Sequence, residues 1–121
     1  MTIFDRFSLK GRVAVVTGGG GQLGSEFSKT LAEAGATVSI ADLNIESAHR
    51  TTKRLTDDGF SAFAYPLDVT RPESSRELVA EIKKQFGRLD ILVNSAALDP
   101  KFDLDAATKG IQLALGPLSS V

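Results

Sequence analysis

Short apolar runs alternate along the chain with segments in which apolar residues recur every three or four positions. Four runs have the length and composition of buried strands, at residues 12–18, 36–42, 60–68 and 89–97. Three segments between them have helical spacing, at residues 22–35, 44–59 and 71–87. Strands that alternate with helices predict an α/β fold, in which a parallel sheet with right-handed crossovers carries helices on both faces.

The predicted helices also carry signals for where they begin and end. In the first helix, Leu23, Phe27, Leu31 and Ala34 recur at helical spacing, and Gly35 follows as a stop. The other two helices have residues suited to a helix start and a glycine at the end, namely Asn44 and Gly59 for the second and Pro72 and Gly87 for the third.

Composition narrows the class of protein. With 121 residues, 42% of them hydrophobic, the chain can form one small domain with a core. A net charge of −1 argues against a nucleic-acid-binding surface. No run is long enough to cross a membrane and no signal peptide is recognisable, so we expect a cytoplasmic protein; the absence of cysteine fits a reducing compartment. Residues 1–97 are expected to form the domain, and residues 98–121 are a tail without a clear assignment.

A glycine-rich segment, TGGGGQLG, joins the first predicted strand to the first helix. Gly19, Gly21 and Gly24 fit the pattern G-x-G-x-x-G in the strand–turn–helix context that a dinucleotide-binding loop requires. The free N–H groups of a helix N-terminus bind phosphate, and glycines remove the β-carbons that would block a pyrophosphate. The alternative is a plain tight turn.

An acidic residue strengthens the dinucleotide interpretation. Asp42 ends the second predicted strand, where a carboxylate can accept hydrogen bonds from the hydroxyls of a ribose and repel a 2′-phosphate. Neither of its neighbours, Ala41 and Leu43, is basic. These residues predict that NAD is preferred over NADP. The alternative is that Asp42 is an ordinary turn residue or helix cap.

On these features the chain resembles the short-chain dehydrogenase/reductase family. The resemblance rests on FSLKGRVAVVTGGGGQLG, on Asp42, on LDVT around Asp68 and on FGRLDILVNSAA, and it covers about residues 7–100. It implies a Rossmann-type doubly wound sheet of strand order 3-2-1-4, truncated after four strands. It also implies cofactor-binding positions, namely Thr17, Gly18, Gly21, Gln22, Leu23 and Gly24 at the pyrophosphate, Asp42 and Leu43 at the end of the second strand, Asp68 and Val69 at the adenine, and Asn94, Ser95 and Ala96 along the ribose.

The chain departs from the family pattern in two motifs. The usual loop has glycine where this chain has Gln22, so the spacing resembles TGxxGxxG of the sugar-nucleotide branch. By contrast, the segment Asn94–Ala97 resembles the NNAG motif of the standard branch, with serine and alanine substituted. The segment FGRLDILVN favours the standard branch.

No catalytic residue is predicted. The family's Tyr-x-x-x-Lys motif is absent, because the only tyrosine, Tyr65, is followed four positions later by Val69. The resemblance therefore implies the cofactor half of an NAD-dependent oxidoreductase, which transfers hydride between nicotinamide and an unidentified small molecule with a hydroxyl or carbonyl group. A non-catalytic NAD-binding module and a non-functional truncated fragment are the alternatives.

Two further features concern metals and partners. With a single histidine, His49, and no cysteine, no metal site is predicted, and Asp99, Asp103 and Asp105 are interpreted as a solvated loop. A sheet of order 3-2-1-4 leaves the fourth strand at an edge, with unpaired backbone groups. We therefore expect a homo-oligomer through that edge, and neither nucleic acid nor membrane as a partner.

Overall fold

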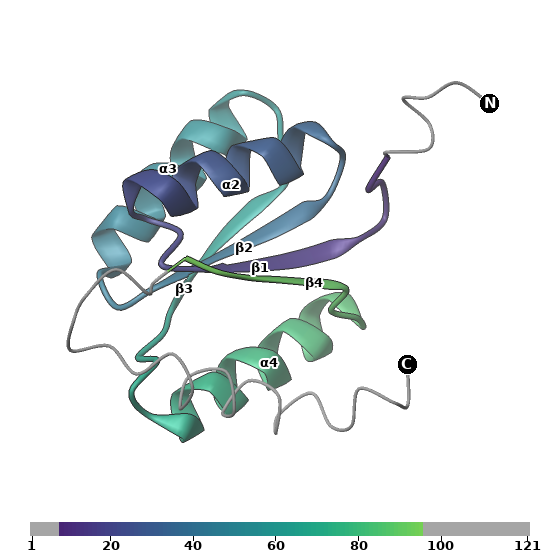
Figure 1. Cartoon of the computed structure of the whole chain (residues 1–121). Coiled ribbons are helices and arrows are strands. Elements are labelled where there is room, and N and C mark those ends of the chain that lie inside the picture. Colours follow the sequence, from purple (N-terminus) through teal and green to yellow (C-terminus); the bar gives the residue numbers. More distant parts are fainter. Residues whose placement is uncertain (1–7, 96–121) are drawn as a thin grey trace.

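A computed structural model of the chain describes residues 8–95, in which strands and helices alternate regularly (Figure 1). The elements are β1 (Val13–Thr17), α2 (Gln22–Glu33), β2 (Thr37–Asp42), α3 (Ile45–Asp57), β3 (Ala62–Pro66), α4 (Pro72–Phe86) and β4 (Ile91–Asn94). The predicted elements are confirmed. Both β3 and β4 are shorter than the runs that predicted them, and the end of the fourth run lies outside the described residues.

The four strands form one parallel sheet of order β3-β2-β1-β4, which confirms the predicted topology. All five residues of β1 are buried, because strands flank it on both sides and helices cover both its faces. All four residues of β4 are partly exposed. Within residues 8–95, β3 and β4 are the two edges of the sheet.

Helices α2 and α3 cover one face of the sheet, and α4 covers the other (Figure 1). Successive residues of a strand point to opposite faces, so each strand contributes to two cores. The core under α2 and α3 contains the larger set of buried side chains, among them Ala14, Val16, Val38, Ile40 and Leu55. The core under α4 contains Val13, Val15, Ala41, Leu67, Leu78 and Ile82.

The face by which α2 packs differs from the apolar stripe in its sequence. The buried residues of α2 are Gly24, Ser28 and Ala32, whereas Leu23 is 47% exposed and Phe27 is 40% exposed. The prediction of a helix is confirmed, and of the apolar residues at helical spacing Leu31 packs against the core while Leu23 and Phe27 are exposed. Residues four apart lie on one side of a helix, and three small residues there let α2 approach the sheet closely.

The amino ends of β1 and β4 are joined by one carboxylate. Asp90 Oδ2 accepts hydrogen bonds from the backbone N–H of Val13 at 2.8 Å and from Arg88 Nε at 2.8 Å. Its Oδ1 accepts from Arg88 Nη2 at 2.7 Å and lies 3.5 Å from Arg12 Nη1. The hydrogen bonds from Arg88 are the main cause that lowers the pKa of Asp90, and the same contacts fix β4 against β1.

Candidate functional site

The four parallel strands all end on the same side of the sheet, and most of the predicted site residues lie at these carboxyl ends. The strand register places Thr17 of β1 opposite Ala41 of β2 and Asn94 of β4, and it places Asp42 opposite Pro66 of β3. In an open parallel sheet, a ligand binds at this edge, at the point where the strand order reverses. Here that point lies between β1 and β4.

The glycine-rich turn is packed tightly on its inner side. Gly18 has a φ of 66°, a left-handed conformation that favours glycine. A β-carbon on Gly19 would lie 2.7 Å from Ile40 Cγ2, and one on Gly20 would lie 2.6 Å from Ser47 Cβ. Packing inside the protein therefore already requires two of the four consecutive glycines, whatever binds at the turn.

The outer side of the turn is open. A β-carbon on Gly21 would meet only the carbonyl oxygen of Gly18, at an ordinary 3.4 Å. Gly21 precedes α2 with an extended backbone and supplies no side-chain cap. Within residues 8–95, the N–H groups of Gln22 and Leu23, in the first turn of α2, therefore have neither an intrahelical acceptor nor a capping side chain. The positive end of a helix dipole adds to the attraction of an anion to such a terminus.

Gly24 closes the turn against β1 and β4. A β-carbon at this position would lie 2.2 Å from the carbonyl oxygen of Gly18 and 2.7 Å from Ser95 Oγ. Ser95 in turn donates its hydroxyl to the carbonyl of Thr17 and its N–H to the same oxygen. The hydroxyl of Thr17 lies 3.1 Å from Asn94 Oδ1, within hydrogen-bond distance. These contacts hold the start of α2 against the carboxyl ends of β1 and β4.

The carboxylate of Asp42 is hydrogen-bonded within the protein. Oδ2 accepts from the N–H of Gly20 at 3.0 Å, and Oδ1 accepts from the N–H of Asn44 at 3.0 Å. Asn44 caps α3 through Oδ1, which accepts from the N–H of Ser47, as predicted. The next residue after the acid, Leu43, is 75% exposed, so an apolar side chain projects from this edge.

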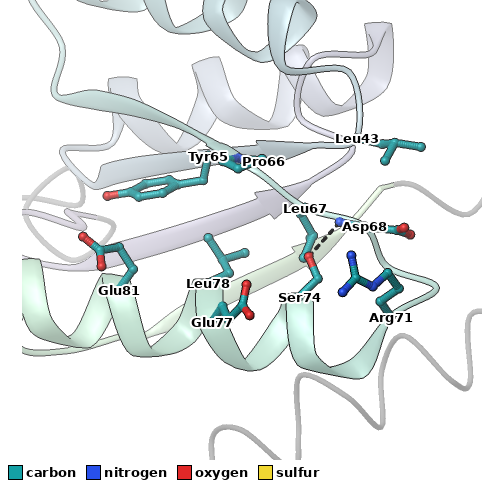
Figure 2. Close-up of a pocket in the computed structure, with 10 residues that line it drawn as sticks. All are labelled: Leu43, Tyr65, Pro66, Leu67, Asp68, Arg71, Ser74, Glu77, Leu78 and Glu81. Atoms are coloured by element: carbon teal, nitrogen blue, oxygen red, sulfur yellow. Dashed lines mark hydrogen bonds between the residues drawn. The ribbon is translucent and has the colours of Figure 1, made fainter.

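Asp68 lies in the loop between β3 and α4, and its carboxylate also has local partners. Oδ1 accepts from the N–H and the hydroxyl of Thr70, and the N–H of Asp68 donates to Ser74 Oγ at 2.9 Å (Figure 2). The hydrogen bonds from Thr70, followed by the positive charge of Arg71, lower the pKa of Asp68. The adjacent Val69 is half-buried and packs against the core under α4. Because its pKa is lowered, the Asp68 carboxylate keeps its charge to a lower pH than a free aspartate does.

A pocket of about 450 Å³ lies between the end of β3 and α4. Leu43, Asp68 and Arg71 line one end, and Tyr65 and Glu81 line the other (Figure 2). Partial burial, followed by the charge of Glu81, raises the pKa of Tyr65. Tyr65 therefore remains protonated, and its hydroxyl donates to Gln85 Oε1. Figure 2 shows its ring at the end of the pocket away from Asp68, so the two groups do not form one reactive centre.

Comparisons with known proteins identify the family to which this fold belongs. A family model described as short chain dehydrogenase matches residues 12–113. The chain belongs to the short-chain dehydrogenase family. It is 41% identical over 90 residues to an uncharacterised oxidoreductase of Bacillus subtilis, a match that covers 74% of this chain and 35% of the relative.

Two solved structures are similar to this chain. Gluconate 5-dehydrogenase from Burkholderia cenocepacia, in complex with NADP and tartrate, has a TM-score of 0.81 and 32% identity over 93% of this chain and 50% of its own. An oxidoreductase from Haemophilus influenzae with bound NAD has a TM-score of 0.68 and 34% identity over 75% of this chain and 32% of its own. The chain therefore spans about a third to a half of the length of these three proteins.

Other predicted features concern the end of the chain, metals and membranes. Ala96 and the acidic residues of the tail lie outside the described residues. Within residues 8–95, no group of three or more potential ligands could hold a metal ion, and His49 is exposed on α3. In the same part of the chain, none of the helices has the length and apolar character to cross a membrane.

Sequence reasoning missed the residues that hold the candidate site in shape. Gly20 bonds to Asp42, and Thr70 and Ser74 hold Asp68 and its backbone. A threonine two positions after an aspartate is a weak signal of such a local turn. The contact between Gly20 and Asp42 joins positions 22 apart in sequence, and no local pattern reports it.

Proposed function

We propose that this chain forms the cofactor-binding part of an NAD-dependent oxidoreductase. The observation that carries the proposal is the uncapped start of α2 beside Gly21, whose outer side is open, with the carboxylate of Asp42 at the same edge of the sheet. Bound nicotinamide would supply hydride transfer to or from a carbon that bears a hydroxyl or carbonyl group. Membership of the short-chain dehydrogenase family supports this class of reaction.

We assign the parts of the cofactor to this edge as follows. The pyrophosphate lies on the outer side of the glycine-rich turn, where the first N–H groups of α2 have no partner among the described residues and a β-carbon is missing. The adenosine ribose lies at Asp42, because each carboxylate oxygen has accepted one hydrogen bond and has a lone pair left for a hydroxyl. The remaining candidates along the cofactor are Thr17, Gly18, Gln22, Leu23, Gly24, Leu43, Asp68, Val69, Asn94, Ser95 and Ala96.

We further propose that NAD is preferred over NADP. The negative charge of Asp42 would face the 2′-phosphate of NADP, and Leu43 offers no positive charge to offset it. Relatives with NAD and with NADP are both known, so the preference rests on these residues alone. We expect NAD to bind at least about tenfold more tightly, because roughly 1.4 kcal/mol of repulsion suffices for that factor.

The test is a titration of the chain with each cofactor, read by thermal unfolding and calorimetry. NAD at about one hundred times its dissociation constant should stabilise the fold by roughly 2.7 kcal/mol. The substitution Gly21→Asp sharpens the test, because the backbone of Gly21 suits a capping residue. An aspartate there should raise the free energy of unfolding by about 0.5 kcal/mol while it excludes the pyrophosphate.

The matched control for that variant is Ser61→Asp, which adds the same charge at an exposed position just before β3. Ser61 lies at the amino end of its strand, away from the carboxyl ends where the candidate site lies. Its affinity for NAD should equal that of the unmodified chain. Unchanged NAD affinity in Gly21→Asp would show that the turn does not hold the phosphates. Equal affinities of the unmodified chain for NAD and NADP would overturn the preference.

We assign no catalytic residue to this chain, and two alternatives follow from that. The chain can be an NAD-binding module without turnover, or a fragment without function. The geometry at the carboxyl ends of the strands favours the binding module over the inert fragment, because the packing inside residues 8–95 accounts for Gly19 and Gly20 but not for the uncapped start of α2 beside Gly21. NAD binding without oxidation of NADH in the presence of carbonyl compounds would support the module, and no binding would support the fragment.

We also propose that the outer edge of β4 pairs with a second copy of the chain. Ile91, Leu92 and Val93 are only partly buried, and this edge carries neither charge nor proline. The opposite edge strand, β3, ends in Pro66, which has no N–H to offer a new partner. Sedimentation should show a concentration-dependent dimer; a monomer at all concentrations would contradict the pairing.

A further inference from the structure

The carboxylate of Asp42 joins three segments that are separate in the sequence. It ends β2, and its two oxygens accept one N–H each, from Gly20 in the glycine-rich turn and from Asn44 at the start of α3, both at 3.0 Å. Both donors are backbone groups, so these hydrogen bonds depend on the path of the chain. One side chain therefore fixes the position of the turn relative to α3.

Gly20 fits closely into the place where this hydrogen bond holds it. A β-carbon on Gly20 would lie 2.6 Å from Ser47 Cβ and 2.7 Å from the backbone nitrogen of Ala48, so its Cα sits directly on the first turn of α3. The only other hydrogen bond from the turn to β2 runs from the N–H of Gly19 to the carbonyl of Ala41, at a longer 3.3 Å. The bond to Asp42 is also the one with a charged acceptor, which makes it the stronger of the two.

We propose that Asp42 is a positioning residue that holds the glycine-rich turn in its phosphate-binding shape before any cofactor arrives. This inference rests on the proposed function in one respect, namely that the turn receives the pyrophosphate. Each carboxylate oxygen keeps a lone pair, so ribose hydroxyls can bind without releasing Gly20. The same acid then contacts the ribose directly and orders the phosphate site indirectly.

This double role has a consequence for cofactor selectivity. If Asp42 acted only by touching the ribose, its neutralisation would trade NAD affinity for NADP affinity. With the turn also dependent on it, neutralisation releases Gly20 and lowers the affinity for both cofactors, because both carry the same pyrophosphate. A variant designed to accept NADP would have to replace the lost hydrogen bond to Gly20 as well.

The first experiment measures the turn itself, without cofactor. Amide hydrogen exchange at Gly20 is compared in the unmodified chain, Asp42→Asn and Asp42→Ala. The asparagine keeps the size of the side chain but has only one oxygen, and the alanine has none. We expect exchange at Gly20 to accelerate about tenfold or more in both variants, the loss expected when a charge-assisted hydrogen bond is removed.

The control for this experiment is Asp57→Asn, which removes the same charge from the far end of α3, where Asp57 forms an exposed ion pair with Lys53. Exchange at Gly20 should be unchanged in this variant. An unchanged rate at Gly20 in both Asp42 variants overturns the proposal. Because no cofactor is present, this result does not depend on whether the chain binds NAD.

The second experiment separates the two roles of Asp42 by removing the ribose hydroxyls from the ligand. An NAD analogue that lacks the 2′- and 3′-hydroxyls of its adenosine ribose cannot donate to the carboxylate. We expect Asp42→Ala, which has no oxygen to accept from Gly20, to bind this analogue about threefold to tenfold more weakly than the unmodified chain does. Equal affinities of the two proteins for the analogue would mean that Asp42 acts by direct contact alone, and the proposal would fail.

Discussion

Gly24 offers a direct test of how closely α2 approaches the sheet. Alanine favours helices over glycine by about 1 kcal/mol, so Gly24→Ala in the first turns of α2 should be stabilising if only the helix mattered. The structure predicts the opposite. The added β-carbon would lie 2.2 Å from the carbonyl oxygen of Gly18, 2.7 Å from the Cα of Gly19 and 2.7 Å from Ser95 Oγ.

The size of the effect follows from which atoms must move. Overpacking a core lowers stability by about 1–3 kcal/mol. Two of the three atoms that the new β-carbon would meet belong to the backbone and cannot rotate away, so we expect a cost of about 3 kcal/mol, at the upper end of that range. Subtracting about 1 kcal/mol for the better helix propensity leaves a loss of about 2 kcal/mol. For a domain of this size, each kcal/mol shifts the melting temperature by roughly 4–8 °C, so Gly24→Ala should melt roughly 8–16 °C lower.

The assay is urea and thermal unfolding followed by circular dichroism, with Gly21→Ala as the matched control. A β-carbon on Gly21 meets only the Gly18 carbonyl, at 3.4 Å, and its backbone is one that any residue adopts. Gly21→Ala should lower the free energy of unfolding by less than about 1 kcal/mol, because alanine is a poorer N-cap residue than glycine. If Gly24→Ala melted at or above the temperature of the unmodified chain, the close packing of α2 against Gly18 would be refuted.

Two further predictions concern packing and pH. The lowered pKa of Asp90 means that its stabilisation is complete above the unfolded-state value of about 3.9 and is lost as pH falls through the folded value. Urea titrations should therefore show a steeper loss of stability below about pH 4 for the unmodified chain than for Asp90→Asn; parallel curves would contradict this contribution. Phe27→Gln should change stability by less than about 1 kcal/mol, since Phe27 is 40% exposed, whereas Ala32→Gln, at 3% exposure, should cost roughly 2 kcal/mol or more. Equal costs for the two glutamine variants would contradict the packed face.

The elements of this fold could be predicted because local signals agreed with the global arrangement. The buried run of β1 and the helical spacing in α4 each matched one type of element, and Gly87 ends α4 in the left-handed conformation. Strand order followed from the alternation of strands and helices together with the family resemblance. These features depend on periods of two and 3.6 residues and on single turn residues, all of which are present in a sequence.

The packed face of α2 could not be predicted from hydrophobicity, because the property that decides it is size. Gly24, Ser28 and Ala32 are less apolar than Leu23 and Phe27, but only small side chains fit where the helix crosses the end of β1. The spacing of small residues at every fourth position was present in the sequence as a signal. This spacing of small residues competes with the apolar residues as a signal for the buried side. The close approach of Gly24 to the turn at Gly18 determines which side of the helix faces the sheet.

The candidate site shows the same limit in its polar groups. An acid at the end of β2 is evident from the sequence, but its hydrogen bond to Gly20 depends on how far the turn folds back over β2. That path is set by the tight contacts of Gly19 with Ile40 and of Gly20 with Ser47. The glycines were therefore predicted for a reason that concerns the ligand, while the structure adds a reason that concerns the protein. Because one turn serves both purposes, a substitution that disturbs the inner side should lower stability and NAD affinity together, whereas Gly21→Asp on the outer side should separate them.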